Sequence, residues 1–203
     1  MRSTSERYNG ALTREQFLLR EMRIVAKLRL EGFSDEEIVD KVWEQNLFQY
    51  PTEKLLKNKA QACLRRLNAL NETPLLIDIL ARGSVNEARQ AALIAMMLKS
   101  ALLSEFMVSV IGEKYRILDR TLSRKDLSVF FLRLQQQDQD VAGWSVSTVE
   151  KIKTVILNCL KETGYIKDVR EGILYPVYLP EQMTQAIRNA GFSAILPAFN
   201  VFI

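Results

Sequence analysis

Apolar residues recur at helical spacing along most of the chain, which predicts a mainly α protein. The clearest case covers residues 144–164, where one side of the predicted helix is apolar and the opposite side is polar. Ser145 or Ser147 can cap its start, and Gly164 stands where helices commonly end in a left-handed turn. The apolar stripe consists of Val149, Ile152, Ile156 and Leu160, and the polar stripe consists of Ser147, Lys151, Thr154 and Asn158.

The segment that follows this helix predicts a small β-hairpin. Residues 165–169 and 173–179 are typical of strands, and residues 170–172 are typical of a tight turn. A helix followed by a hairpin is the layout of a winged helix, whose helix enters the DNA major groove while the hairpin lies near the phosphates. A structural helix with a solvated polar face is the alternative. The residues predicted to bind DNA in this half are Ser145, Ser147, Thr148, Lys151, Thr154, Asn158, Lys167 and Arg170.

Two capping boxes predict where helices begin in the first fifty residues. Thr13 with Gln16, and Ser34 with Glu37, have the spacing at which side-chain and backbone donors satisfy each other. Both pairs stand before stretches with helical periodicity. The helices that they start are predicted over about residues 14–31 and 35–45.

A third, basic helix is predicted over about residues 52–70, directly after Pro51. Its polar positions repeat the spacing of the polar stripe in residues 144–164. The order of elements up to this helix is helix, short turn, helix, connector and basic helix. This order is compatible with a helix-turn-helix-like domain, although three-helix units without a nucleic-acid role are at least as common. We expect this helix to supply most of the affinity for DNA. Its predicted DNA-binding residues are Lys54, Lys57, Asn58, Gln61, Arg65 and Arg66.

A break in the helical pattern at residues 71–74 predicts a domain boundary. The predicted organisation is a flexible N-terminus over 1–12, an N-terminal helical domain over 13–72, a C-terminal helical, winged-helix-like domain over 73–190, and an apolar tail over 191–203. Because exposed apolar area costs about 25 cal/mol per Å², the uncharged tail is expected to pack on its own chain or on a partner. Further helices are predicted over about residues 75–81, 86–113, 123–136 and 181–189.

Composition and charge describe an ordinary globular protein with a mild basic excess. The chain has 203 residues, 48% of them hydrophobic and 26% charged, with a formal net charge of +4. This excess permits a polyanionic partner without demanding one. The two cysteines, far apart in the sequence, suit a reducing compartment, and no segment resembles a signal peptide or a membrane span. We therefore expect a cytoplasmic protein with no membrane partner.

The sequence lacks the residues that most enzymes use. It has no histidine, which removes the commonest general base and the most frequent transition-metal ligand. No glycine-rich phosphate loop is present, and two distant cysteines cannot form a structural zinc site. Asp138 and Asp140 could bind a divalent cation, but a solvated polar loop is the preferred interpretation. We therefore expect a non-enzymatic protein with no metal and no cofactor.

Four short segments, in this order and spacing, resemble the BrxA family, the small helical component of BREX bacteriophage-exclusion systems. They are residues 17–21 (FLLRE), 46–49 (NLFQ), 65–67 (RRL) and 144–148 (WSVST). The resemblance implies a non-enzymatic DNA-binding protein of phage defence, encoded beside a methyltransferase, a phosphatase-like protein and an ATPase. Members have also been described as putative inner-membrane proteins, which disagrees with the absence of any long apolar segment here.

Two classes of function follow from these observations. The first is a non-enzymatic accessory protein of a BREX system that binds double-stranded DNA through basic amphipathic helices. The alternative is a protein-interaction adaptor, in which the same helices and the apolar tail hold other BREX proteins without direct DNA contact. The oligomeric state is left open.

Overall fold

The computed structural model describes residues 8, 12–13 and 17–202, and these residues form two compact units. The N-terminal unit contains Leu18–Lys99 and Pro180–Gly191. The C-terminal unit contains Ser100–Leu179, residues 192–202 and the described residues that precede Leu18. Both units are helical, which confirms the mainly α prediction.

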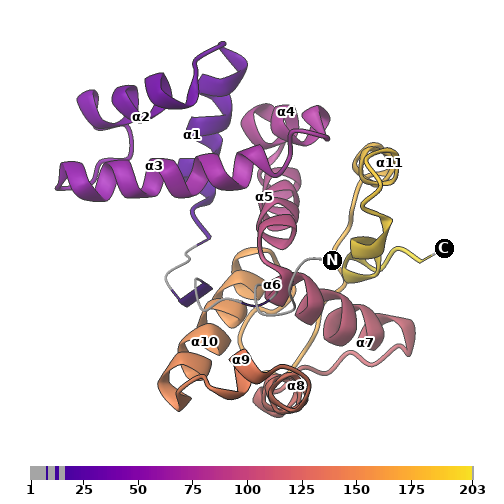
Figure 1. Cartoon of the computed structure of the whole chain (residues 1–203). Helices are drawn as coiled ribbons and strands as arrows, with labels where there is room; N and C mark the ends of the chain where they lie inside the picture. Colours follow the sequence, from indigo (N-terminus) through magenta and orange to yellow (C-terminus); the bar gives the residue numbers. More distant parts are fainter. Residues whose placement is uncertain (1–7, 9–11, 14–16, 203) are drawn as a thin grey trace. The chain divides into compact units, whose positions relative to one another are not determined.

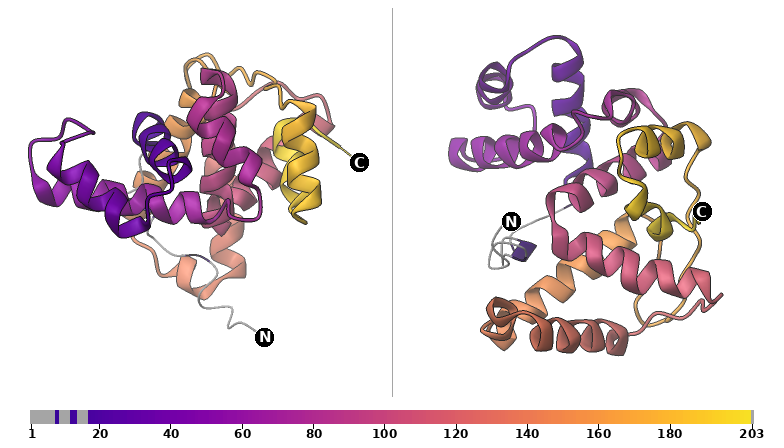
Figure 2. Two further views of the ribbon diagram at one scale, coloured as in Figure 1. Left: turned by 90° about the horizontal axis from the view of Figure 1, so that it is seen from above. Right: turned by 45° about the vertical axis from the view of Figure 1, so that its right-hand side comes forward.

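The N-terminal unit is organised around its first helix, which packs against the third, fourth and fifth helices. The fully buried side chains of this unit include Met22 of the first helix and the leucines Leu67, Leu76, Leu80 and Leu93. The last helix of the unit returns from far along the chain and lies beside the fourth (Figure 2). The helices are α1 (Leu19–Leu30), α2 (Asp35–Glu44), α3 (Glu53–Asn68), α4 (Pro74–Arg82), α5 (Val85–Lys99) and α11 (Glu181–Asn189).

Local sequence signals place most of these helices correctly. The Ser34 and Glu37 capping box of α2 is present, with the Glu37 amide donating to the Ser34 hydroxyl over 3.3 Å. The start of α1 differs from the prediction, because Leu18 has a left-handed φ of 56° and the helix begins only after it. The predicted capping box at Thr13 lies partly outside the described residues, because Gln16 is not among them.

The boundary expected near residue 72 lies inside the N-terminal unit. α4 buries Leu76, Ile77 and Leu80, and its main partners are α1 and α5. An amphipathic helix needs a partner for its apolar face, so α4 and α5 complete the unit that α1–α3 begin. The chain passes from one unit to the other at residues 99–100.

The long helix predicted over residues 86–113 is broken at Ser100. The Ser100 hydroxyl accepts the Leu103 amide over 3.3 Å and caps the start of a new helix, α6 (Ala101–Phe106). Apolar residues continue through the break, so hydrophobic periodicity did not reveal it. In the described part of the chain no single helix has the length and hydropathy to cross a membrane, although Val85–Lys99 and Ala101–Arg116 pass that test when taken together.

The C-terminal unit has an aromatic core between α6 and α8, the two helices labelled in Figure 1. The ring centroids of Phe106 and Phe130 are 5.2 Å apart, and those of Phe130 and Phe131 are 5.4 Å apart. Beyond α6 the unit contains the π-helix η3 (Met107–Gly112), α7 (Glu113–Arg116), α8 (Arg124–Gln137), α9 (Gln139–Ala142), α10 (Val146–Glu162) and the 3₁₀-helix η4 (Ser193–Phe199).

The apolar tail packs on its own chain. Leu196 and Phe199 of η4 are buried, and η4 lies against η3. The Tyr165 hydroxyl donates to the Ala198 carbonyl over 3.0 Å. A Cβ atom at Gly112 would lie 2.9 Å from the Pro197 Cβ, so the contact between η3 and η4 requires glycine at that position. The tail is therefore part of the core of the C-terminal unit.

The hairpin predicted over residues 165–179 does not form, and no residue from 17 to 202 is in a β-strand. One backbone hydrogen bond joins the two arms, from the Tyr175 amide to the Tyr165 carbonyl over 2.8 Å. The second arm pairs elsewhere: Thr121 and Ile173 form an isolated antiparallel bridge. Pro176 then removes the next donor. The Gly172 carbonyl and the Leu174 amide bond to residues 122 and 120, whereas the Tyr175 amide bonds to Tyr165, so the second arm has neighbours on both sides and keeps a single bond to the first arm.

Candidate nucleic-acid interface

The polar stripe of α3 faces solvent as predicted. The exposed positions are Lys54, Asn58, Gln61 and Arg65. The buried positions on the opposite side are Leu56, Ala60, Cys63, Leu67 and Leu70. Thr52 caps the helix by accepting the Leu55 amide over 3.3 Å. Sequence periodicity therefore gave the correct orientation of this helix.

Two predicted DNA contacts on α3 are already engaged within the protein. Lys57 Nζ lies 2.6 Å from Glu53 Oε1 and 4.2 Å from the centroid of the Trp43 ring. Arg66 is only 2% exposed and cannot reach a phosphate, so its prediction as a DNA contact is wrong. The difference between Arg65 and Arg66 arises because consecutive helix positions are rotated by about 100°.

We expect Arg66→Gln to destabilise the protein by about 2–3 kcal/mol, because it removes a buried charged group from its polar surroundings. Arg65→Gln, one residue earlier and exposed, should change the free energy of unfolding by about 0.5 kcal/mol or less. Urea titrations of the two variants measure this difference. Equal stabilities would show that Arg66 contributes nothing to the fold.

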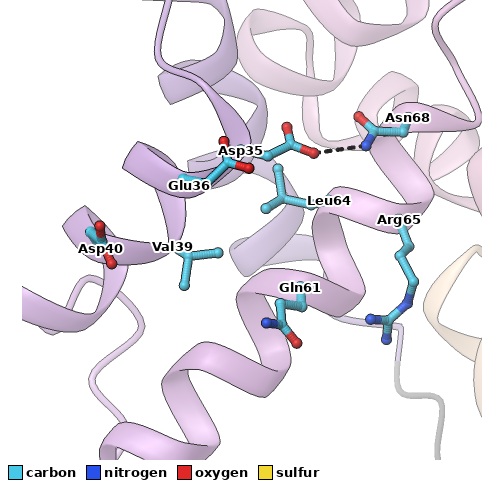
Figure 3. Close-up of a pocket in the computed structure, with 8 residues that line it drawn as sticks. All are labelled: Asp35, Glu36, Val39, Asp40, Gln61, Leu64, Arg65 and Asn68. Atoms are coloured by element: carbon cyan, nitrogen blue, oxygen red, sulfur yellow. Dashed lines mark hydrogen bonds between the residues drawn. The ribbon is translucent and has the colours of Figure 1, made fainter.

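α2 packs against α3, with contacts at both ends of the pair (Figures 1 and 3). Asn68 donates to Asp35 over 2.9 Å at one end, and Lys57 covers Trp43 at the other. The helix-turn-helix-like arrangement of this unit remains a prediction.

The groove between these two helices has a volume of about 450 Å³ and an acidic side. Figure 3 shows the carboxylates on α2 and the amide of Gln61 on α3. Negative charge next to Gln61 and Arg65 lowers the positive potential along this edge of α3. The lining residues are Asp35, Glu36, Val39 and Asp40 of α2 and Gln61, Leu64, Arg65 and Asn68 of α3.

α10 has the two faces that the sequence predicts. Ser145, not Ser147, is its cap, because the Ser145 hydroxyl accepts the Thr148 amide over 3.2 Å. Thr154 is exposed, and its hydroxyl donates to the Glu150 carbonyl over 2.9 Å. The apolar stripe Val149, Ile152, Ile156 and Leu160 is buried, and the polar stripe Ser147, Lys151, Thr154 and Asn158 is exposed.

Further cations that the sequence analysis missed lie near this face. Ser123 and Asp126 form a capping box at the start of α8, which places Arg124 and Lys125 in its first turn. Arg124 and Thr154 line one groove between α8 and α10. Cations in the first turn oppose the helix dipole, and this unfavourable placement is the signal that could have identified them.

The segment with Lys167 and Arg170 is joined to the start of α8. The Leu122 amide donates to the Gly172 carbonyl over 2.9 Å, two residues from Arg124 on one side and two from Arg170 on the other. Lys167 is exposed, with Nζ 4.9 Å from the Tyr175 ring centroid. The structure therefore brings together α10, the start of α8 and the 165–174 segment.

Lys114 pairs with two acids near the start of α8. Its Nζ lies 2.8 Å from Asp119 Oδ2 and 3.0 Å from Asp126 Oδ1. Hydrogen bonds from Lys114 and then from Thr121 lower the pKa of Asp119 to about 2. Seven cations of this region are exposed and form no ion pair among the described residues. They are Arg120, Arg124, Lys125, Lys151, Lys161, Lys167 and Arg170.

Comparison with known proteins identifies the family. The model of the BrxA family matches residues 6–191. The chain belongs to the BrxA family. Members that carry the name BREX protein BrxA include one from Bacillus cereus, 32% identical over 79% of this chain and 80% of that protein. Another, from Paramagnetospirillum magneticum, is 25% identical over 97% of this chain and 98% of its own length.

The fold is also shared with a solved structure. A crystal structure of an uncharacterized protein from Magnetospirillum magneticum matches with a TM-score of 0.78 and 25% identity, covering 95% of this chain and 98% of that one. A BREX protein BrxA from Escherichia coli is 27% identical over 88% of this BrxA-family chain and 82% of the relative. The resemblance stated from four short segments is therefore confirmed.

Proposed function

We propose that this BrxA-family chain is a non-enzymatic accessory protein of a BREX phage-defence system that binds double-stranded DNA. The C-terminal unit is the main DNA-binding part, with the exposed face of α10 in the major groove. The cations at the start of α8 and in the 165–174 segment contact phosphates on either side.

The order of elements in the C-terminal unit supports a winged-helix-like arrangement. The helical segment α6–α7 is followed by the extended residues 120–122 and then by helix α8. Helix α10 comes later in the chain, and the two extended arms of residues 165–175 follow it. The Thr121–Ile173 bridge and the hydrogen bond from Tyr175 to Tyr165 supply the pairings that a wing needs. In this arrangement the strands are reduced to one bridge and one hydrogen bond.

The single observation that carries the proposal is the exposed polar face of α10, flanked by cations without acid partners. Phosphate contacts dominate the strength of DNA binding, whereas hydroxyl and amide groups mainly position the duplex or read bases. α3 fits this role less well, because Lys57 is paired, Arg66 is buried and carboxylates of α2 line its edge. This reverses the division of labour expected from the sequence.

A salt titration of binding to a random-sequence duplex tests the proposal. The logarithm of the binding constant falls with the logarithm of salt concentration at about 0.9 per phosphate contact. With about four contacts, affinity should fall about 100-fold between about 50 and 200 mM salt. Fluorescence anisotropy of a labelled duplex measures this slope. Negligible affinity at the lowest salt would rule out the DNA-binding function.

The second candidate function, a protein-interaction adaptor, is favoured by the groove between α2 and α3. Asp35, Glu36 and Asp40 line it on one side, and Val39 and Leu64 give it an apolar part. Such a groove complements a basic segment of a protein partner. An adaptor without a DNA role would show no salt-dependent duplex binding, so the same titration separates the two functions.

A further inference from the structure

A second, smaller groove lies between α8 and α10 and gathers groups that suit an anion. Its volume is about 160 Å³, and it is separate from the α2–α3 groove. The residues that line it include two cations, Arg124 and Lys153, and two hydroxyls, those of Ser128 and Thr154, which donate to the backbone carbonyls of Arg124 and Glu150. Leu127 and Leu157 form its apolar part, and Glu150 is its single acid.

Lys153 is held in place inside this groove. Its side chain is only 16% exposed, and Nζ lies 5.9 Å from the Phe131 ring centroid. Two hydrogen bonds are made by Nζ, one of 2.8 Å to Glu150 Oε1 and one of 3.2 Å to Ser128 Oγ. A lysine ammonium has three N–H donors, so one donor remains available to a ligand.

Glu150 differs from Lys153 in its freedom to move. Its side chain is 61% exposed, and among the described residues its carboxylate contacts Lys153 alone. A carboxylate and a phosphate make the same kind of charge-assisted hydrogen bond with an ammonium group. Glu150 therefore occupies the position on Lys153 that an anionic ligand would take.

We propose that this groove is a binding site for one backbone phosphate of duplex DNA, and that the phosphate displaces Glu150 from Lys153. This inference rests on the proposed function and adds to it a specific contact and an internal competitor. The phosphate lies between Lys153 and Arg124, with the Ser128 and Thr154 hydroxyls as neutral neighbours. A single phosphate fits the small volume, and the exposed face of α10 continues past it into the major groove.

The competitor gives the site a distinctive signature. Removing the charge of Glu150 frees Lys153 and should strengthen DNA binding, whereas removing the charge of Lys153 should weaken it. Glu162 provides a matched control, because it is an exposed glutamate on the same helix and pairs with no cation among the described residues. Any general effect of removing one negative charge appears in both glutamate variants.

The experiment measures binding of full-length Glu150→Gln, Lys153→Gln, Glu162→Gln and Arg124→Gln to one labelled random-sequence duplex across a salt series. Glu150→Gln should bind about threefold more tightly than Glu162→Gln, with an unchanged salt slope. Lys153→Gln should bind about tenfold more weakly than the parent. Its salt slope should be shallower by about 0.9, which is one phosphate contact. The double variant Glu150→Gln/Lys153→Gln should bind like Lys153→Gln alone, because the competitor has nothing left to block.

Three results would overturn the inference. Equal affinities of Glu150→Gln and Glu162→Gln would remove the competitor, and an unchanged salt slope in Lys153→Gln would remove the contact. If Lys153→Gln loses helical content, Arg124→Gln, on the other wall of the groove, provides the same slope test. A parent protein that does not bind duplex rejects the proposed function together with the site, whereas a binding parent with unaffected variants rejects the site alone.

Discussion

Replacing Arg124 and Lys125 together with glutamate should weaken binding to duplex DNA by about 100-fold, because each lost charge-assisted contact contributes about 1.5 kcal/mol or more. Both residues are exposed in the first turn of α8, where the proposed interface needs positive charge. Fluorescence anisotropy at low salt measures the loss, and the salt slope should become shallower by about two phosphate contacts.

This double variant should keep its fold. Acidic residues in the first turn of a helix interact favourably with the helix dipole, so the two glutamates should stabilise α8 slightly. The Ser123 and Asp126 capping box is not altered by the change. Circular dichroism should therefore show unchanged helical content, which separates lost binding from unfolding.

Lys54→Glu with Arg65→Glu on α3 is the matched control, because it makes the same change of charge on an exposed helix face of the N-terminal unit. We expect this variant to lose about tenfold in affinity or less, since the α2 carboxylates already lower the potential there. A larger loss in the α3 variant than in the α8 variant would make α3 the main DNA-binding helix, as the sequence alone suggests.

Local signals predicted the elements whose stability depends on neighbours in sequence. The start of α10 was predicted to within two residues from Ser145, Ser147 and the apolar stripe behind them, and α11 was predicted over the residues where it occurs. The cap of α2 followed in the same way from Ser34 and Glu37. Each of these features depends on residues within a few positions of one another, which is the range that periodicity and capping rules describe.

Features decided by distant partners could not be predicted. Helical rotation turns Arg66 away from the exposed face of Arg65, but its burial to 2% exposure depends on the packing of the N-terminal unit around it. In place of the expected hairpin ladder, Gly172 and Leu174 bond to residues 120–122, about fifty residues earlier in the chain. Arg124 lies next to the 165–174 segment because Leu122 pairs with Gly172, fifty residues later in the chain. In each case the deciding contact joins segments whose proximity no local pattern records.

The tail gives the largest expected change in stability. Phe199 is 1% exposed in η4, so Phe199→Ala should lower the free energy of unfolding by about 3–5 kcal/mol through lost burial and a residual cavity. Phe202, three residues later, is 41% exposed and provides a control of the same residue type. Phe202→Ala should lower it by about 1 kcal/mol or less. Urea titrations followed by circular dichroism measure both values. If Phe199→Ala is no less stable than Phe202→Ala, the tail does not contribute to the core, and the fit of Gly112 against Pro197 has no energetic role.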